Sequence, residues 1–374
     1  MAKKRVCIIT SVHSPFDTRI FHKESISLVK AGYDVTLIAQ HDKEEIVDGV
    51  RIINLQKPRN RIERMTRTVW SAFWRALKIN ADVFHIHDPE LLPIGLLLKL
   101  RGKKIIYDMH ENLPKQIKNK KWINPKLRHV LSSSAHWAER LLLSDMPVIF
   151  AEDSYIKDYL WVRKYVIVLN MPLITQLLPF KSDAPVNHVF AIGYIGGVGT
   201  ERGSLITIEA LKKLKDNGIT PRFECVGPID ESHKHILLGK CEKYNIQNVV
   251  FHGYLPAGKG WQIIGQCSVG LAVLHPIPNY IESYPTKIFE YMAMGIPVIA
   301  SNFPLYRAII EENKCGLCVD PLNPAEIAKA IDYILTHPAA AQQMGKNGLR
   351  AVQEQYNWDI EEKKLLAFYE QLLK

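Results

Sequence analysis

The sequence lacks any run of about 18 apolar residues, so no segment predicts a membrane-spanning helix. The basic start, Met1–Arg5, precedes an apolar stretch that ends before Ser11, which is too short for the core of a signal peptide. We therefore expect a chain that stays in the cytosol. Its 374 residues, 47% hydrophobic and 23% charged, indicate a soluble protein of two domains.

Cysteine is scarce, and its pattern excludes a disulfide framework. Six cysteines are scattered along the chain, and the one C-x-x-C motif joins Cys315 to Cys318. A zinc site would need a second cysteine pair or histidines at matching spacing, and none is present. We expect reduced thiols and no bound metal.

The basic excess lies in the first half of the chain. Residues 1–170 hold 29 Lys and Arg against 18 Asp and Glu, whereas the remainder holds 19 against 20. Such asymmetry predicts an anionic partner for the first half, whether nucleic acid, anionic lipid or a phosphate-bearing substrate.

The densest basic stretches interleave with tryptophan. They are residues 57–67, followed by Trp70 and Trp74, and residues 115–128. This pattern suits an anionic membrane surface, and the alternative is a solvated helix face with core tryptophans. The candidate residues for such a surface are Arg59, Arg61, Arg64, Arg67, Lys118, Lys120, Lys121 and Trp122.

Short apolar runs alternate with amphipathic segments along the chain. Runs at residues 6–10, 34–39, 51–55, 81–87, 104–107, 147–150 and 165–169 predict buried parallel strands, and so do 189–195, 222–226, 249–252, 269–274, 297–300 and 316–319. Intervening helices end at glycine, as at Gly32 and Gly102. We expect an α/β protein of two doubly wound domains, with ligands at the carboxyl ends of the strands.

The pattern also sets the expected boundaries. We predict a first domain at residues 1–175, a polar linker at 176–188 and a second domain at 189–355. Residues 356–374 predict one more amphipathic helix that packs back on the first domain.

Two glutamates flank a predicted helix start in the stretch Glu282-Ser-Tyr-Pro-Thr-Lys-Ile-Phe-Glu290. Pro285 suits the first position of a helix that Gly295 ends, which puts Glu282 in the loop and Glu290 inside the helix. A carboxylate can accept both hydrogens of a vicinal diol, and N–H groups near Pro285 together with Lys287 suit an anion. By itself the pattern also fits a solvent-facing Glu290 paired with Lys287.

The run 282–301, with its two glutamates and the segments MAMG and PVIAS, resembles the donor-nucleotide motif of retaining family 4 glycosyltransferases. Residues 13–39 and 85–111 are similar to members of this family that act on bacterial surface polysaccharides. Residues 194–203 resemble its phosphate-binding segment, and residues 323–331 its late helix. The resemblance implies the GT-B fold of two Rossmann-like domains facing a cleft, one for the acceptor and one for the nucleotide-sugar donor.

Carried over by position, the resemblance implies that Glu290 holds the ribose and that Glu282 contacts the transferred sugar. Arg202 stands where the family places a lysine on the diphosphate, and a guanidinium can take that role. Gly197 departs from the pattern, because the family often has an arginine there, so Arg19 or Lys287 would meet the remaining charge. The other implied donor-binding residues are Gly196, Gly197, Pro285 and Thr286, with Tyr254 and Leu255 near the base.

In the first domain, His110 follows the fifth predicted strand, where the family keeps a histidine near the anomeric centre. We expect His85 and His87 to point to opposite faces of their strand, which leaves only His87 as a ligand-facing candidate. The acceptor-binding candidates are His13, Arg19, His87, Asp88 and Glu111.

No D-x-D motif is present, the usual way in which a glycosyltransferase of the other fold holds a metal. We therefore expect metal-independent transfer, with positive side chains and a helix N-terminus stabilising the leaving group. In this family the departing phosphate oxygen is thought to take the acceptor's proton. His110 and Glu282 would then act at the reacting sugar, with His110 orienting it.

Three alternatives remain open. A dinucleotide-dependent dehydrogenase would need a G-x-G-x-x-G after the first strand of a domain, and neither residues 10–15 nor 195–200 supply one. A nucleic-acid-binding protein would explain the basic half but not the paired glutamates. A GT-B epimerase of sugar nucleotides would use the same cleft without an acceptor.

The expectation is a hexosyltransferase of cell-surface polysaccharide assembly, peripheral on the inner face of the cytoplasmic membrane. It would transfer a sugar from a UDP- or GDP-sugar to a polyprenyl-diphosphate-linked or other saccharide acceptor. It would need no cofactor.

Overall fold

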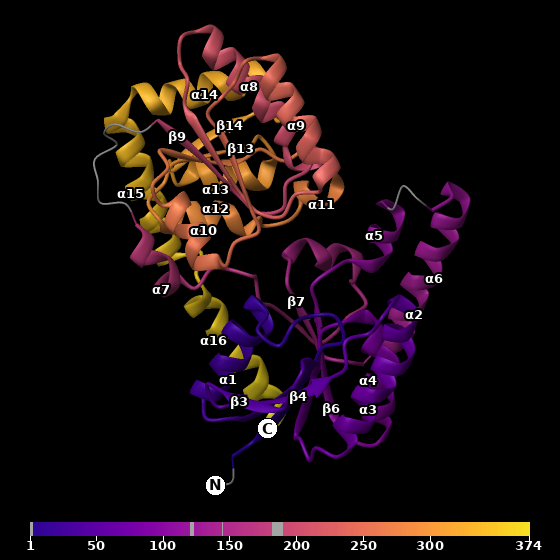
Figure 1. The fold of residues 1–374 in the computed structure, drawn as a ribbon. Coiled ribbons are helices and arrows are strands. Elements are labelled where there is room, and N and C mark those ends of the chain that lie inside the picture. Colours follow the sequence, from indigo (N-terminus) through magenta and orange to yellow (C-terminus); the bar gives the residue numbers. More distant parts are fainter. Residues whose placement is uncertain (1–2, 120–122, 144, 182–189) are drawn as a thin grey trace. The chain divides into compact units, whose positions relative to one another are not determined.

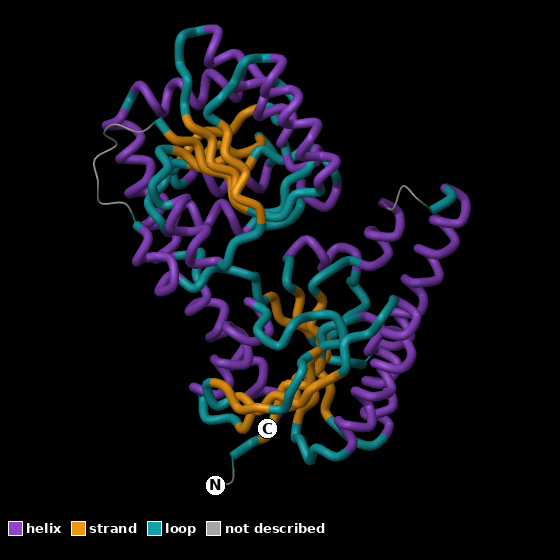
Figure 2. Tube along the Cα trace, in the orientation of Figure 1, coloured by secondary structure: helices purple, strands orange, loops and turns teal. Residues whose placement is uncertain are grey.

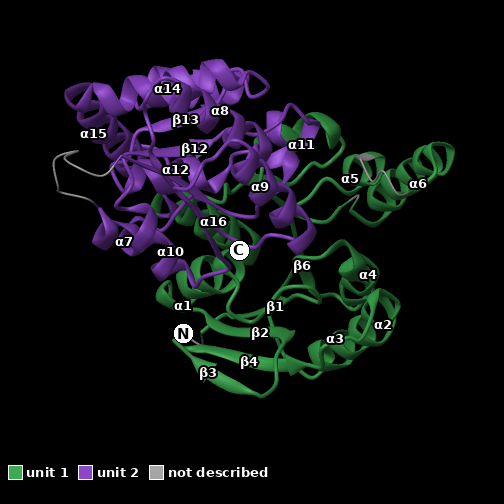
Figure 3. Ribbon diagram, turned by 45° about the horizontal axis from the view of Figure 1, so that its top comes forward, with its two compact units in different colours: residues 1–170, 359–374 green, residues 171–358 purple. Residues whose placement is uncertain are grey.

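The computed structural model describes residues 3–119, 123–143, 145–181 and 190–374 (Figure 1). The chain forms two compact units, residues 1–170 with 359–374 and residues 171–358 (Figure 3). Parallel strands with helices on both faces make up each unit (Figure 2), which confirms the expected α/β class of two Rossmann-like domains. Among the described helices, none is long and apolar enough to span a bilayer.

Unit 1 is built on a sheet of eight strands in the order β3-β4-β2-β1-β5-β6-β7-β8. All neighbours are parallel except β3, which is antiparallel to β4. The strands are β1 (Arg5–Ile9), β2 (Asp34–Gln40), β3 (Glu45–Val47), β4 (Val50–Leu55), β5 (Val83–Ile86), β6 (Lys104–Met109), β7 (Val148–Phe150) and β8 (Tyr165–Ile167).

Helices cover both faces of this sheet, with α1 and α16 on one side and α3 and α4 on the other (Figure 1). The helical elements are η1 (Thr18–Ser25), α1 (Ile26–Lys30), α2 (Arg61–Glu63), η2 (Arg64–Thr68), α3 (Val69–Leu77), η3 (Pro89–Leu91), α4 (Leu92–Leu100), α5 (Leu113–Asn119), α6 (Pro125–Leu143), η4 (Asp153–Asp158) and α16 (Trp358–Leu373). The apolar core on one face joins β1, β5 and β6 to α3 and α4, through residues such as Ile9, Phe84 and Leu98.

Unit 2 is built on six parallel strands in the order β11-β10-β9-β12-β13-β14. The strands are β9 (Ala191–Ile195), β10 (Arg222–Val226), β11 (Val249–Gly253), β12 (Val269–Ala272), β13 (Val298–Ser301) and β14 (Gly316–Val319). Its helical elements are α7 (Ile174–Leu177), η5 (Leu178–Phe180), η6 (Thr200–Arg202), α8 (Ser204–Asp216), α9 (Glu231–Lys243), α10 (Ala257–Ile264), α11 (Pro278–Ile281), α12 (Thr286–Ala293), α13 (Pro304–Glu312), α14 (Pro324–Thr336) and α15 (Pro338–Glu354).

The order of the strands reverses beside the first strand of each unit. β1 lies between β2 and β5, and β9 lies between β10 and β12. In open parallel sheets the loops that leave the carboxyl ends of the strands on either side of such a reversal diverge and leave a crevice for a ligand. The segments after β1 and β5 in unit 1, and after β9 and β12 in unit 2, are therefore where binding groups are expected.

The final helix belongs to unit 1 although it follows unit 2 in the sequence. The Glu361 carboxylate of α16 accepts a hydrogen bond from the Leu169 N–H at 2.8 Å, and the Tyr369 hydroxyl lies 2.8 Å from Nδ1 of His85. Lys104 of β6 donates to the carbonyl of Leu372. These contacts place α16 on unit 1, as the amphipathic pattern predicted.

Two elements differ from the sequence-based expectation. The short edge strand β3 was not predicted, because its three residues include two of only partial burial and give no apolar run. The predicted linker at 176–188 begins too late: the two compact units divide at Asn170, and residues 176–180 already lie in α7 and η5 of unit 2. The remainder of that linker, residues 182–188, lies outside the described residues.

Candidate functional site

A glycine loop follows β9 at the point where the strand order of unit 2 reverses. Gly196 has φ +119°, and its N–H donates to the Val226 carbonyl at 2.9 Å. Gly227, after β10, has φ +148°, and a Cβ there would lie 1.9 Å from the Gly196 carbonyl oxygen. Only glycine fits two backbones that approach so closely, so this pair holds the loop against β10.

Lys287 ends beside this loop. It lies in the first turn of α12, is 6% exposed, and its Nζ has no hydrogen-bond acceptor among the described residues. Nζ lies 3.7 Å from the centre of the Tyr194 ring, and a Cβ on Gly196 would lie 3.5 Å from it. Burial, with the charge of Arg202 as a smaller cause, lowers the pKa of Lys287 to about 7.

Arg202 also approaches this loop. A Cβ on Gly197 would lie 3.8 Å from the guanidinium carbon of Arg202, which also sits 5.7 Å from the centre of the Tyr280 ring. Two cations thus converge on Gly196 and Gly197, and one of them, Lys287, is buried with no hydrogen-bond acceptor among the described residues. A buried cation is costly unless paired, which indicates a site for an anionic ligand.

The paired glutamates lie where the helix pattern put them. Glu282 follows α11, Glu290 lies within α12 one turn after Lys287, and both are half-buried. The charge of Glu290 opposes the lowering of the Lys287 pKa. Pro285 caps α12 rather than opening it, one position from the expectation, because its ψ of 116° is extended and not helical.

The remaining donor candidates differ in how far their side chains are exposed. Thr286 is exposed at the first position of α12, and Leu255 is half-buried after β11. Tyr254 is 76% exposed, so a planar ligand could lie on its ring without displacing protein atoms. All of these residues follow carboxyl ends of strands or begin α12.

In unit 1, His110 directly follows β6, and its side chain is 18% exposed. Its Nε2 lies 3.0 Å from Nδ1 of His87 and 3.3 Å from an oxygen of Asp108. Its carbonyl accepts a hydrogen bond from the Tyr155 hydroxyl at 2.9 Å. The ring is therefore held from inside the domain, with one edge left toward solvent.

His13 lies near His110, with ring centres 5.8 Å apart, and its Nδ1 is 3.3 Å from Asp17. The hydrogen bond to Asp17 raises the pKa of His13. Asp17 also caps η1 by accepting from the N–H groups of Arg19 and Ile20. His13 and the exposed Glu111 thus remain accessible acceptor candidates.

Asp88 has a structural role instead of the expected contact with acceptor. It is 3% exposed, and one oxygen accepts from the Thr10 hydroxyl at 2.8 Å and the Ser11 N–H at 2.6 Å. These bonds hold the loop after β1 against the loop after β5. Its burial and these bonds therefore argue against a contact between Asp88 and an acceptor.

Arg19 is also unsuited to an incoming phosphate or acceptor. It is 3% exposed, donates to Asp108 at 2.9 Å and to the Val168 carbonyl at 2.9 Å, and pairs with Glu24 at 2.9 Å. Its guanidinium is committed to internal acceptors. The expectation that it might meet diphosphate charge is therefore wrong.

The expectation that His85 and His87 point to opposite faces is also wrong. Positions two apart on a strand share a face, and the two rings stack with centres 4.4 Å apart. His87 is buried beneath His110, so it supports that ring rather than facing ligand.

The predicted basic surface is partly described. Arg59, Arg61, Arg67 and Lys118 are exposed, and Arg64 is half-buried in an ion pair with Glu90 at 2.7 Å. Lys120, Lys121 and Trp122 lie outside the described residues. Trp70 and Trp74 are 49% and 60% exposed, so they are not core tryptophans.

Three residues at these sites were not anticipated. Tyr194 and Tyr280 flank the two cations, and Asp108 holds His110. Tyr194 lay within the segment that resembled a phosphate loop, and Asp108 lay two residues before His110, so position relative to a strand end was the available signal. The cysteines are all free, as expected.

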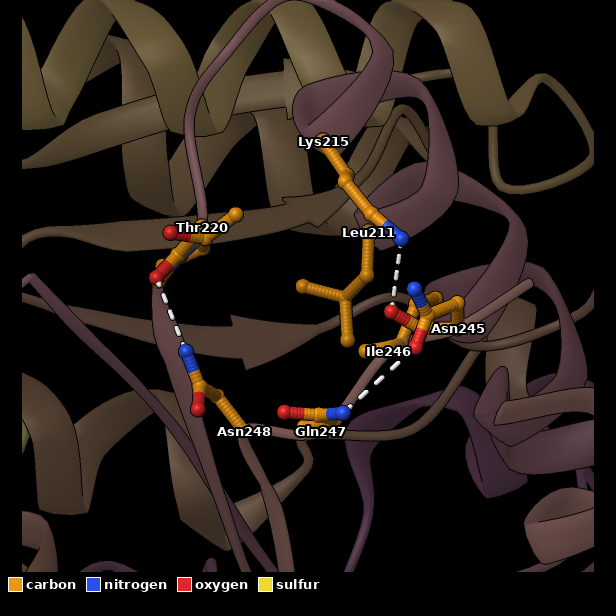
Figure 4. A pocket seen from close by; sticks show the side chains of 8 residues that line it. Leu211, Lys215, Thr220, Asn245, Ile246, Gln247 and Asn248 are labelled. Atoms are coloured by element: carbon orange, nitrogen blue, oxygen red, sulfur yellow. Dashed lines mark hydrogen bonds between the residues drawn. The ribbon is translucent and has the colours of Figure 1, made fainter. Parts of the chain in front are cut away.

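A cavity of about 300 Å³ elsewhere in unit 2 does not compete as the functional site (Figure 4). It lies at the amino ends of β10 and β11, away from the loops that follow strands. Its polar groups bond one another: Lys215 donates to the Tyr244 and Asn245 carbonyls, and Asn248 donates to the Thr220 carbonyl.

Comparisons with known proteins identify the family. The model described as Glycosyl transferases group 1 matches residues 180–351, and the model described as Glycosyltransferase Family 4 matches residues 18–165. Glycogen synthase from Mycobacterium tuberculosis strain H37Rv is 20% identical over 91% of this chain and 87% of its own length. Other relatives match in part: the alignment covers 12% of sucrose synthase from Denitrovibrio acetiphilus and 45% of alpha-D-kanosaminyltransferase from Streptomyces kanamyceticus.

Solved structures share the fold. Sucrose-phosphate synthase from Thermosynechococcus elongatus gives a TM-score of 0.78 at 20% identity, covering 99% of both chains. HepE from Anabaena, solved with UDP and glucose, gives 0.73 at 14% identity and covers 98% of this chain and 100% of its own. With both halves matched by glycosyltransferase models and the whole chain by this architecture, the protein belongs to the family 4-like glycosyltransferases of GT-B fold.

Proposed function

We propose that the protein is a retaining, metal-independent hexosyltransferase that uses a UDP- or GDP-sugar and a lipid-linked saccharide acceptor in cell-surface polysaccharide assembly. The observation that carries the donor assignment is the buried ammonium of Lys287 beside the Gly196 loop, which has no hydrogen-bond acceptor in the part of the chain that the structure describes. A diphosphate placed there would pair with both Lys287 and Arg202.

The donor's other groups follow from the surrounding residues. Glu290, one turn along α12 from Lys287, would accept hydrogen bonds from the two ribose hydroxyls. Glu282 would contact hydroxyls of the transferred sugar, and the loop at Tyr254 and Leu255 would lie against the base. The HepE structure contains UDP and glucose, which supports a uridine nucleotide as the first donor to test.

The leaving group would be stabilised by fixed positive charge. Lys287 and Arg202 neutralise the diphosphate as the glycosidic bond to it breaks, and N–H groups in the first turn of α12 add the positive end of a helix dipole. The absence of a D-x-D motif in the sequence fits this arrangement. The departing phosphate oxygen would take the acceptor's proton on the face that it leaves, which retains the anomeric configuration.

His110 would orient the transferred sugar. Its ring is fixed by His87 and Asp108 and keeps one edge toward solvent, as a positioning group requires. His13 and Glu111 would contact the acceptor.

The basic helices of unit 1 support a peripheral location on the inner face of the cytoplasmic membrane. Arg61 and Arg67 are exposed beside Ile62 and Met65, which are 77% and 59% exposed. Exposed apolar side chains among arginines match an anionic lipid surface and offer a route to a lipid-linked acceptor.

A nucleotide-binding experiment tests the donor site directly. Thermal-shift measurements with UDP, GDP, ADP, CMP and NAD, with and without magnesium, should show stabilisation by one nucleoside diphosphate irrespective of magnesium. Lys287→Met should abolish the shift because it removes the unpaired ammonium while keeping the length of the side chain. Lys259→Met, on an exposed lysine of α10, is the matched control and should bind as the wild type does.

The outcomes separate the alternatives. Stabilisation by NAD alone, or binding unchanged in Lys287→Met, would overturn the donor assignment. Hydrolysis of a UDP- or GDP-sugar without transfer to any saccharide acceptor would favour the epimerase or a different acceptor class.

A further inference from the structure

Four buried side chains meet inside unit 1, and two of them, His87 and Asp108, also hold the His110 ring. Glu24 comes from η1, His85 and His87 from β5 and the residue after it, and Asp108 from β6. All four are buried, with exposures of 0 to 2%. One ligand atom from each lies within 4.8 Å of the others.

One nitrogen of each imidazole in this cluster has no hydrogen-bond partner among the described residues. Nε2 of His85 and Nε2 of His87 are buried and make no hydrogen bond within the described part of the chain. Nε2 of His87 lies 3.5 Å from Glu24, and Nε2 of His85 lies 3.8 Å from Asp108. These separations are too long for hydrogen bonds in either tautomer of the rings.

The opposite nitrogens of the rings are already used. Nδ1 of His85 lies 2.8 Å from the Tyr369 hydroxyl, and Nδ1 of His87 lies 3.0 Å from Nε2 of His110. A ring that donates from Nδ1 presents its Nε2 lone pair to the centre of the cluster. Ligating histidines usually have their second nitrogen fixed in this way.

Arg19 supplies the outer contacts of both carboxylates. It donates to Asp108 at 2.9 Å and pairs with Glu24 at 2.9 Å. Ligating carboxylates are commonly hydrogen-bonded by such donors. The two carboxylates and the arginine still leave one negative charge buried, which a proton or a cation must offset.

We propose that Glu24, His85, His87 and Asp108 hold one divalent transition-metal ion in the core of unit 1. Ligands of a tetrahedral ion with bonds of about 2.0–2.1 Å lie about 3.3 Å apart. Two of the pairs here are 3.5 and 3.8 Å apart, and all four ligand atoms lie within 4.8 Å of one another. Two imidazoles with two carboxylates suit Zn²⁺, Co²⁺, Fe²⁺ or Mn²⁺. The ion would join η1, β5 and β6 beneath His110, and it would not be a ligand of the donor diphosphate, whose cations lie in unit 2.

The test measures metal directly and needs no transferase assay. Tag-free protein purified without chelator should carry about one equivalent of a divalent transition metal by plasma mass spectrometry. After chelator treatment, Co²⁺ titration should give visible d–d bands that saturate at about one equivalent. Absence of a sulfur-to-cobalt charge-transfer band would exclude the cysteines as ligands.

Variants locate the ion. Glu24→Gln and His85→Gln should weaken Co²⁺ binding by about 100-fold or more, because each removes a ligand and keeps a side chain of similar size. Glu139→Gln is the matched control: Glu139 is another buried carboxylate of unit 1 with an unbonded oxygen, outside the cluster. It should bind Co²⁺ as the wild type does.

Two results would overturn the proposal. One is wild-type protein that is folded by circular dichroism, carries no metal and gives no saturable Co²⁺ spectrum, since Glu24 and Asp108 would then share a proton instead. The other is a Co²⁺ site that persists in both ligand variants. If the variants fail to fold, the wild-type titration alone decides, and a failure of the proposed sugar transfer would leave these readouts unaffected.

Discussion

The ammonium of Lys287 lies 3.7 Å from the centre of the Tyr194 ring and has no hydrogen-bond acceptor among the residues that the structure describes. A ring face stabilises a desolvated cation by roughly 2 kcal/mol, less than the several kcal/mol that burial of an unpaired charge costs. Burial of the charged Lys287 side chain therefore lowers the stability of the folded protein, and an anionic ligand beside it would reduce this cost. The predictions for the donor site follow from this relationship.

We predict that Lys287 makes folding stability depend on pH above neutrality. Its folded pKa is about 7 and its ordinary value is 10.5, so between these values the unfolded chain binds one more proton than the folded chain. The free energy of unfolding should rise with pH there, by up to about 1.4 kcal/mol per pH unit. Urea denaturation at several pH values gives the free energy of unfolding of the wild type and of Lys287→Met. The difference between the two proteins should change with pH at this slope, and a difference that stays constant with pH would contradict the assignment.

The same lysine predicts proton uptake when a nucleoside diphosphate binds. A phosphate beside Nζ favours the charged form and raises the pKa, so at roughly pH 8 binding should take up close to one proton. Calorimetry in two buffers of different ionisation enthalpy measures this number. Uptake should vanish in Lys287→Met and remain in Lys259→Met.

Glu290→Gln should weaken binding of the nucleoside diphosphate by about 10- to 100-fold. Hydrogen bonds from the ribose hydroxyls to a carboxylate contribute about 1.5–3 kcal/mol, and the amide accepts with one oxygen only. Titration calorimetry measures the loss, and Glu312→Gln, on an exposed glutamate of α13, serves as control. A 2′-deoxynucleotide should lose affinity for the wild type but little for Glu290→Gln, and equal losses would remove Glu290 from the ribose.

Gly227→Ala should destabilise unit 2 by roughly 2 kcal/mol or more. A Cβ at this position would meet the Gly196 carbonyl at 1.9 Å, and φ of +148° is unfavourable for alanine. Gly239→Ala is the contrasting control, since Gly239 lies within α9 with no atom within 4 Å of its Cβ position, and it should stabilise by about 1 kcal/mol. Thermal denaturation compares the two, and a Gly227→Ala variant as stable as wild type would show that the loops can separate.

Exchange of Trp70 and Trp74 for alanine, with Arg61→Gln and Arg67→Gln, should reduce binding to phosphatidylglycerol vesicles by at least about 10-fold. Each basic residue near an anionic surface contributes about 1 kcal/mol, and the indoles add interfacial contacts. Because these side chains are exposed, thermal stability should change little. Lys212→Gln with Lys213→Gln in α8 is the control in unit 2, and equal vesicle binding by all proteins would argue against membrane association.

Much of the fold was predictable because periodicity reports local burial. Every predicted strand was confirmed near its expected place, and the helix between Glu282 and Gly295 formed with Lys287 and Glu290 one turn apart. The edge strand β3 was not predicted, because a strand of three residues at the margin of a sheet needs no apolar run in the sequence. The convergence of Lys287 and Arg202 was suggested by family resemblance, but the burial of Lys287 was not.

The unit 1 site shows what local pattern omits. Local pattern predicts a free cation at Arg19 and a ligand at Asp88, yet each side chain is held by internal partners. The sequence allows Trp70 and Trp74 to be either core or surface residues. Their exposure in the folded α3 shows that they lie on the surface.

The sequence by itself determined the two doubly wound domains, the helix at the paired glutamates and the basic character of the first half. Each of these features depends on residue types and spacings within a short stretch, and such local patterns can be read from the sequence. The tertiary structure alone decided that Arg19 meets Asp108, 89 residues away, and that Glu24 lies beside His85 of β5 and His87 just after it. Such meetings depend on the order in which strands enter the sheet, and no local spacing specifies that order.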